Sequence, residues 1–168
     1  MAQAQRLWVI RAVEGKGQGM FATRDINKGD LILIEKPAAM VNKWSHELTP
    51  NDVQLALAHL TPRQRRGYST LSDKGGTSHN KNVRIFQTNC IGQQGTLKGY
   101  ICLTLSRINH SCIPNATKAE RDGYKSYTLT AVNKIKRDEE ITINYLEYAQ
   151  YYTAAQRDAL YQHIWKCE

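Results

Sequence analysis

The chain has 168 residues, of which 41% are hydrophobic, and its 23 lysines and arginines exceed its 15 acidic residues to give a net charge of +8. This length suits one domain, and folding should bury about 70% of the surface of the unfolded chain. No apolar run is long enough to span a membrane, and the first residues lack the pattern of a secretion signal. We therefore expect an intracellular protein without membrane association, and a monomer.

The basic residues are spread along the chain, and their densest cluster is RQRR at residues 63–66. Such a cluster is typical of a solvated helix face, so nucleic acid is not expected as the primary partner. The four cysteines are Cys90, Cys102, Cys112 and Cys167. A chain with this many apolar residues needs no disulfide framework, so we expect reduced thiols, with Cys102 buried in a structural role.

The first half of the chain predicts strands, then helices. Residues 7–23, LWVIRAVEGKGQGMFAT, predict a strand, a glycine turn and a second strand. Residues 31–37, LILIEKP, predict an apolar strand that ends before its proline. Residues 48–71 predict a helix with Thr49 as N-cap and Pro50 in the first turn; Pro62 breaks it, and a second short helix follows.

The second half predicts short elements separated by polar segments. Residues 72–82 predict a loop, and residues 83–92 and 96–108 predict short buried segments, of which the first could be helical. Residues 124–135 alternate as a strand does, with Tyr127, Leu129 and Ala131 on one face, and residues 141–145, ITINY, predict another strand. A closing helix is predicted at residues 153–168. The fold class is therefore α+β.

Three glycines alternate in GKGQGMFA, residues 15–22, and allow positive φ or the close approach of a ligand. A dinucleotide-binding motif would open a helix, whereas a strand is expected here, so that interpretation is rejected. A tight hairpin is the simpler interpretation of this motif when it is considered by itself.

Two further motifs follow in order, RINHSCIPNA at residues 107–116 and DEEITINY at residues 138–145. Together with the glycine motif they resemble the SET domain of protein lysine methyltransferases, most closely the SET-and-MYND group and fungal-type relatives, without the MYND zinc module. The resemblance implies several small sheets, a helical insert and a knot-like threading in which NHSCIPN lies beside EEITINY. The expected parts are residues 1–46 and 85–149 for the two SET halves, 47–84 for the insert, and 150–168 for the start of a truncated post-SET segment.

The same resemblance implies a site for S-adenosylmethionine. Asn109 and His110 would contact this cofactor, and Pro114 and Asn115 would fix the turn of their loop. The glycine turn would hold the amino-acid end and the sulfonium region through Lys16, Gly17, Gln18, Gly19 and Met20. By themselves, Asn109 would be a turn residue and His110 a core histidine.

Tyr145 is the expected catalytic residue, and it would also border the cofactor. Transfer of a methyl group needs a neutral lysine amine, although a free lysine has a pKa of about 10.4. A narrow aromatic channel and a nearby sulfonium charge both disfavour the ammonium form, and a tyrosine hydroxyl can hold the amine in line. Asn89, Cys90 and His163 are expected to line this channel, with a buried structural cysteine as the alternative for Cys90.

The end of the chain, LYQHIWKCE, resembles the start of a post-SET segment. In that pattern Cys112 and Cys167 would supply two of four zinc ligands, so the zinc is expected in the full-length protein and not in this fragment. Trp165 would cover the adenine, or anchor a helix. The expected function is an S-adenosylmethionine-dependent protein lysine N-methyltransferase acting on a protein substrate; the alternative is a weakly active or inactive SET-fold binding or regulatory module.

Overall fold

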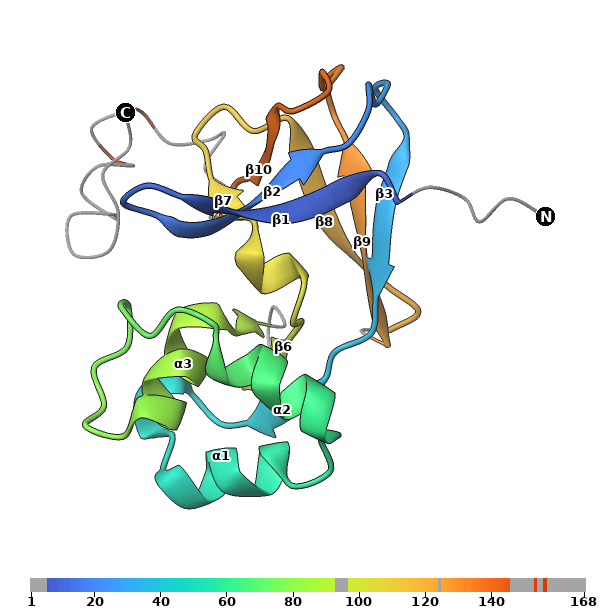
Figure 1. Ribbon diagram of the computed structural model, residues 1–168. Helices are drawn as coiled ribbons and strands as arrows, with labels where there is room; N and C mark the ends of the chain where they lie inside the picture. The colour runs from blue at the N-terminus through green and yellow to red at the C-terminus, as the bar shows by residue number, and fades with distance from the viewer. Residues whose placement is uncertain (1–5, 93–96, 124, 146–152, 154–155, 157–168) are drawn as a thin grey trace. The chain divides into compact units, whose positions relative to one another are not determined.

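The computed structural model describes residues 6–92, 97–123, 125–145, 153 and 156 (Figure 1). The strands are β1 Trp8–Val13, β2 Gly17–Ala22, β3 Leu31–Glu35, β4 Ala39–Asn42, β5 Ile91–Gly92, β6 Lys98–Ile101, β7 Asn109–His110, β8 Ala116–Arg121, β9 Ser126–Ala131 and β10 Glu140–Ile143. The helices are α1 Pro50–Leu57, α2 Pro62–Ser69 and α3 Lys81–Asn89, with 3₁₀ turns η1 Ser45–Glu47 and η2 Leu105–Arg107. The predicted α+β class is confirmed. None of the helices described is long and apolar enough to cross a membrane.

The described chain forms two compact units. Unit 1 contains the described residues of 1–33, 108–119 and 128–168, and unit 2 contains those of 34–107 and 120–127. The predicted boundaries of the SET halves, the insert and the post-SET segment stay predictions, and the predicted closing helix falls outside the described residues.

Unit 1 contains a four-stranded sheet in the order β1-β2-β10-β7 (Figure 1). β2 pairs antiparallel with β1 and with β10, and β10 pairs parallel with β7, where Thr142 lies opposite Asn109 and Ile143 opposite His110. The predicted contact between the NHSCIPN and EEITINY segments is therefore confirmed. The knot-like threading itself stays a prediction.

The β1–β2 hairpin has the strand, glycine turn and strand that its sequence predicts. Gly15 and Gly17 adopt φ of +73° and +81°, which side chains larger than hydrogen disfavour. Within β2, Met20 and Ala22 are fully buried, whereas Gly17 and Gln18 are exposed. The hairpin thus anchors one end in the core and presents its glycine turn to solvent.

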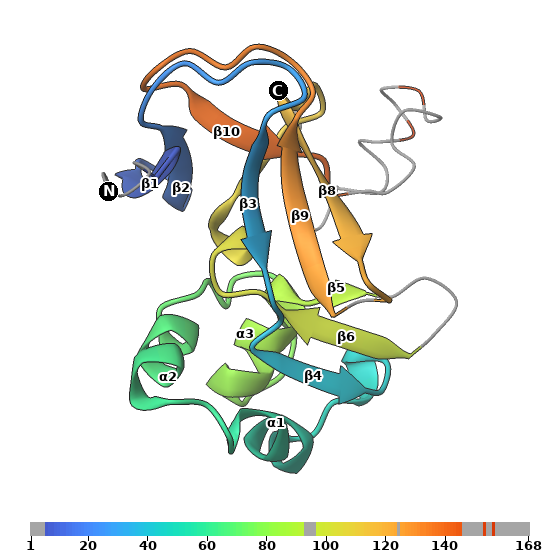
Figure 2. The same cartoon turned by 90° about the vertical axis from the view of Figure 1, so that its right-hand side faces the viewer.

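The second sheet has the order β3-β9-β8, with β9 in the middle (Figure 2). Tyr127, Leu129 and Ala131 of β9 are 3%, 0% and 2% exposed, so the predicted buried face is confirmed. β8 was not predicted from the sequence. Its burial pattern explains why, because only Ala116 is buried and the remaining residues of this edge strand are polar or exposed.

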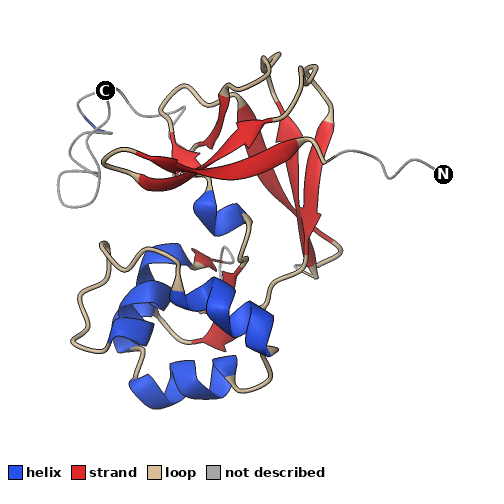
Figure 3. Ribbon diagram, viewed as in Figure 1, coloured by secondary structure: helices blue, strands red, loops and turns tan. Residues whose placement is uncertain are grey.

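Unit 2 packs α1, α2 and α3 against the sheet β4-β6-β5 (Figure 3). α1 and α2 each begin with a capping box, formed by Thr49 with Asp52 and by Thr61 with Gln64. The predicted cap at Thr49 and the second short helix are confirmed. Pro62 does not break α1, however, because α1 already ends at Leu57 and Pro62 is the first residue of α2. The core of this unit is formed by Ala38, Ala39, Val41, Leu48, Val53, Leu57, Leu60, Tyr68, Leu71, Val83, Ile85, Phe86 and Ile101.

Candidate functional site

Asn109 of β7 ties three distant segments of unit 1 together. Its side-chain Nδ2 donates to the backbone oxygen of Gln18 at 3.0 Å and to Oε1 of Glu140 at 2.7 Å. A carbonyl and a carboxylate can only accept hydrogen bonds, so both hydrogens of the amide point toward the hairpin and β10. The predicted cofactor residues Gln18 and Asn109 are therefore brought together.

Gly19 provides the space for this arrangement. A Cβ atom at Gly19 would collide with Oε1 of Glu140, and it would lie 2.8 Å from Cγ2 of Val13 and 3.0 Å from Nδ2 of Asn109. Gly19 is buried, and its lack of a side chain lets the backbone of β2 come close to Asn109 and Glu140.

Asn115 fastens the loop after β7 onto β10. Its Nδ2 donates to Oε1 of Glu139 at 3.0 Å and to the backbone oxygen of Glu140 at 2.8 Å, while its Oδ1 accepts the N–H of Thr142 at 2.9 Å. The Asn115 amide thus bonds to the backbone of β10 as a neighbouring strand would, which agrees with the predicted role of Asn115 in fixing the loop. Pro114, the residue before it, is partly buried.

The imidazole of His110 is held in one tautomer. Its Nδ1 accepts the backbone N–H of Tyr145 at 3.1 Å, so a neutral ring carries its hydrogen on Nε2, which lies 3.3 Å from Sγ of Cys112. Desolvation lowers the pKa of His110 and so favours this neutral form. The ring also lies against that of Tyr145, with centroids 5.3 Å apart.

Tyr145 lies two residues after the end of β10 and is half-buried. Its hydroxyl donates to the backbone oxygen of Ile108 at 2.6 Å. Since the only hydrogen of the hydroxyl is used in this bond, the phenol oxygen can act toward a ligand only as an acceptor. The backbone of Tyr145 is thus held by His110 and its hydroxyl by Ile108, so both ends of the residue are fixed.

The predicted turn residues differ in what they can contribute. Lys16, Gly17 and Gln18 are exposed, and the N–H of Lys16 donates to the oxygen of Val13 at 3.2 Å to close the turn. Met20 is fully buried, so its side chain belongs to the core and supports the hairpin. A cofactor role of the five turn residues, Lys16 to Met20, stays a prediction.

Asn89 and Cys90 belong to unit 2, at the end of α3, so their predicted lining of the channel stays a prediction. Nδ2 of Asn89 donates to the oxygens of Ser72 and Ile85, both at 2.7 Å. Cys90 is a free thiol whose pKa is raised by burial. These bonds give Asn89 a structural role at the end of α3.

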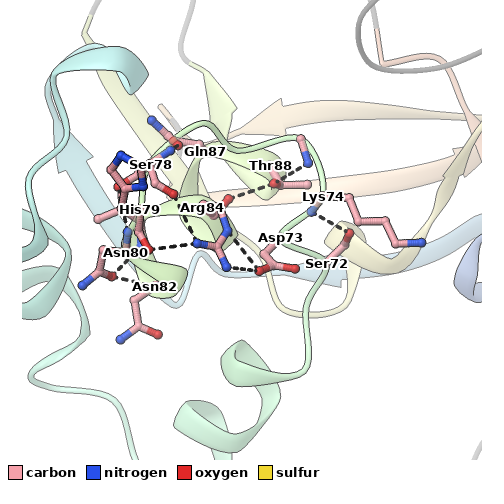
Figure 4. Close-up of polar contacts among 12 residues, drawn as sticks. Ser72, Asp73, Lys74, Ser78, His79, Asn80, Asn82, Arg84, Gln87 and Thr88 are labelled. Atoms are coloured by element: carbon pink, nitrogen blue, oxygen red, sulfur yellow. Dashed lines mark hydrogen bonds and ion pairs between the residues drawn. The ribbon is translucent and has the colours of Figure 1, made fainter.

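The loop before α3 is held onto the helix by polar side chains (Figure 4). Arg84 pairs with Asp73 at 2.7 Å and donates to the oxygens of Ser78 and His79. Thr88 accepts the N–H of Gly75 at 3.1 Å. The polar loop predicted from the sequence is therefore bonded along its length to α3.

Several predicted residues fall beyond what the structure describes, namely His163, Trp165 and Cys167. Cys112 is disulfide-bonded, which differs from the expectation of reduced thiols, whereas Cys102 is a reduced and fully buried thiol, as predicted. Within the described residues, no group of three or more His, Cys, Asp or Glu could hold a metal ion. A zinc site that includes Cys112 stays a prediction.

Glu140 is the site residue that the sequence analysis missed. The signal was present, because two glutamates precede the alternating ITI of β10 and only the second is half-buried. A carboxylate in such a position normally has a partner, and here that partner is Asn109.

Comparison with known proteins identifies the family of this chain. The SET domain family model matches residues 17–146, and the chain belongs to that family. The chain is 26% identical over 161 residues to the histone-lysine N-methyltransferase set5 of Schizosaccharomyces pombe, covering 96% of this chain and 49% of that protein, so it spans about half the length of this curated relative. A solved structure from Plasmodium falciparum, of a protein assigned provisionally as a histone methyltransferase, shares 21% identity at a TM-score of 0.49, covering 85% of this chain and 96% of that one.

Proposed function

We propose that this chain is the catalytic part of an S-adenosylmethionine-dependent lysine N-methyltransferase whose substrate is a histone or another protein. Membership of the SET family and the similarity to a fungal histone-lysine methyltransferase support the activity in general. The observation that carries the proposal is the parallel pairing of β7 with β10, because it joins Asn109, His110 and Tyr145 to the glycine hairpin. The protein would work inside the cell as a monomer, without nucleic acid as its main partner.

The residues of unit 1 fit the amino-acid end of this cofactor. Asn109 keeps Oδ1 as an acceptor because its two hydrogens are already used, and the exposed Gly17 and Gln18 offer backbone groups beside it. When bound, the cofactor supplies an electrophilic methyl group on a sulfonium. Lys16, Gly19 and Met20 would shape the turn around it.

Tyr145 would position the lysine amine. The phenol oxygen can only accept, so it can hold an N–H of the neutral amine while the nitrogen lone pair points elsewhere. Fixing that angle accounts for a large part of the rate in such transfers, since a misplacement of about 1 Å can cost about 10²-fold. His110 would act through Tyr145, because its Nδ1 accepts the backbone N–H of that residue and so holds it in place.

The test is transfer of radiolabelled methyl groups to histones and to fractionated cell proteins, by this chain and by a longer form, with Tyr145→Phe as the variant. We expect a loss of about 10²-fold in transfer. Tyr68→Phe is the matched control, because the Tyr68 hydroxyl likewise donates to a backbone oxygen, that of Asn82 at 2.5 Å, but lies in unit 2. Equal losses in the two variants, or no transfer to any protein, would contradict the proposal; cofactor binding without turnover would favour a SET-fold binding module.

We also propose that the longer protein holds a structural zinc through Cys112, Cys167 and further cysteines. A disulfide and a zinc thiolate are alternative states of the same sulfur, so the zinc site requires Cys112 in its reduced form. Metal analysis of a longer chain purified with reductant should give one zinc per chain, and Cys112→Ser should abolish it. A zinc content that is unchanged in this variant would contradict the assignment.

A further inference from the structure

Glu140 lies within hydrogen-bonding distance of a predicted cofactor residue, but nothing in the site described so far uses its charge. Its Oε1 accepts from Nδ2 of Asn109 at 2.7 Å. Within the described part of the chain, no lysine or arginine pairs with Glu140, although Asp138, two residues earlier, pairs with Arg11 at 2.6 Å. A half-buried carboxylate has lost part of its hydration, and among the described residues the bond from Asn109 is what compensates Glu140 for that loss.

The bond from Asn109 to Glu140 also decides which atom of the amide meets that ligand. Because the carbonyl of Gln18 and the carboxylate of Glu140 occupy both hydrogens, the amide cannot rotate by half a turn without losing both bonds. Oδ1 is therefore the atom that faces away from them. A hydrogen bond to a charged acceptor also polarises the amide, which makes Oδ1 a stronger acceptor.

We propose that Glu140 is a positioning residue for the amino-acid end of the cofactor: it locks the Asn109 amide with Oδ1 presented to the ammonium group of the ligand. The inference deepens the proposed function, on which its ligand depends. It gives the site a preference for ligands that carry an ammonium group over ligands that present only the nucleoside.

Calorimetric titration with two ligands tests this preference. S-Adenosylhomocysteine carries the ammonium group, whereas 5′-methylthioadenosine shares the nucleoside and the thioether but lacks the amino-acid end. For Glu140→Ala we expect the affinity for the first ligand to fall by about 10- to 100-fold, as for loss of a bond to a charged group, and the affinity for the second to stay within about twofold. Glu140→Gln keeps an acceptor without the charge and should fall between parent and Ala.

Two controls separate positioning from structural damage. Glu139→Gln removes the neighbouring carboxylate, which accepts from Asn115 and from the N–H of Lys136, and should weaken both ligands by the same factor. In a double-mutant cycle, Glu140→Ala should add nothing to the loss caused by Asn109→Ala. Equal weakening of both ligands by Glu140→Ala, or additive losses in the cycle, would overturn the inference.

A measurement without ligand keeps the inference separable from the proposed function. In the NMR spectrum, the side-chain NH₂ signals of Asn109, assigned by their loss in Asn109→Asp, should be protected from hydrogen exchange in the parent and exchange at least tenfold faster in Glu140→Ala, since one bond that protects them is gone. If the exchange rate of the Asn109 side chain were unchanged in Glu140→Ala, the inference about Glu140 would be wrong, whereas the proposed function would stand. Failure of the parent chain to bind either ligand would instead overturn the proposed function, and with it the ligand assigned to Oδ1.

Discussion

Gly19→Ala is the perturbation that tests the geometry of the site most directly. The added Cβ would lie 2.8 Å from Cγ2 of Val13, whereas carbon atoms pack at about 3.5 to 4.0 Å, so at least about 0.7 Å of movement is required. Overpacking of this kind costs about 1 to 3 kcal/mol. In a chain of this length, that corresponds to a fall in Tm of about 2 to 12 °C. Because the same Cβ collides with Glu140 and crowds Asn109, ligand binding should weaken as well.

The assay is urea unfolding followed by circular dichroism, together with titration of S-adenosylhomocysteine. Gly92→Ala is the matched control, because Gly92 has open space around its Cβ position and no positive φ. That variant should be unchanged or stabilised by up to about 1 kcal/mol, since alanine restricts the unfolded chain. If Gly19→Ala matched the parent in both stability and affinity, the packed arrangement of Gly19, Asn109 and Glu140 would be refuted.

Two further predictions concern buried and capping carboxylates in unit 2. Glu35 accepts the N–H groups of Thr104 and Leu105, each at 2.8 Å, and its pKa is raised above 4.5 by burial. Just above pH 4.5 the folded state therefore still holds this proton while the unfolded chain has released it, so the free energy of unfolding should fall as the pH rises above 4.5. In urea titrations at several pH values, Glu35→Gln should flatten this slope. An unchanged slope would contradict the assignment. Hydrogen bonds from Lys43 and Thr49 lower the pKa of Asp52 to about 2. The ionised carboxylate should therefore stabilise the fold above pH 3.8, and this stabilisation should be lost as the pH falls toward 2. In thermal unfolding curves, Asp52→Asn should remove that acid-dependent loss of stability.

The elements that could be predicted are those whose signals are local. The caps of α1 and α2 depend on residues three positions apart, and each proline is in its helix's first turn, so both helices begin where the sequence indicates. The buried face of β9 follows from strict alternation. β8 escaped prediction because an exposed edge strand buries only Ala116 and so has no alternation to detect.

The motif segments of the site could be predicted from the sequence, but not their bonds. The resemblance placed NHSCIPN beside EEITINY, and the parallel pairing of β7 with β10 confirms it. The partners of Asn109 lie 91 and 31 residues away, at Gln18 and Glu140, and no local pattern reports them. The sequence predicts that the Tyr145 hydroxyl holds the amine, but it does not show the bond to Ile108 that limits the phenol oxygen to accepting.

The register of β10 shows which force sets this geometry. Ile141 and Ile143 are 0% and 3% exposed, and Glu140 and Thr142 alternate with them on the other face. A slip of one residue would expose both isoleucines, at a cost of about 1.5 to 3 kcal/mol each, or about 3 to 6 kcal/mol in total. That is a large fraction of the stability of a typical domain, about 5 to 15 kcal/mol. The hydrogen bonds of Asn109 contribute less, about 1 kcal/mol for the bond to the backbone oxygen and about 1.5 to 3 kcal/mol for the bond to the carboxylate. Burial of the two isoleucines is therefore the larger force that fixes the strand and brings Glu140 to Asn109.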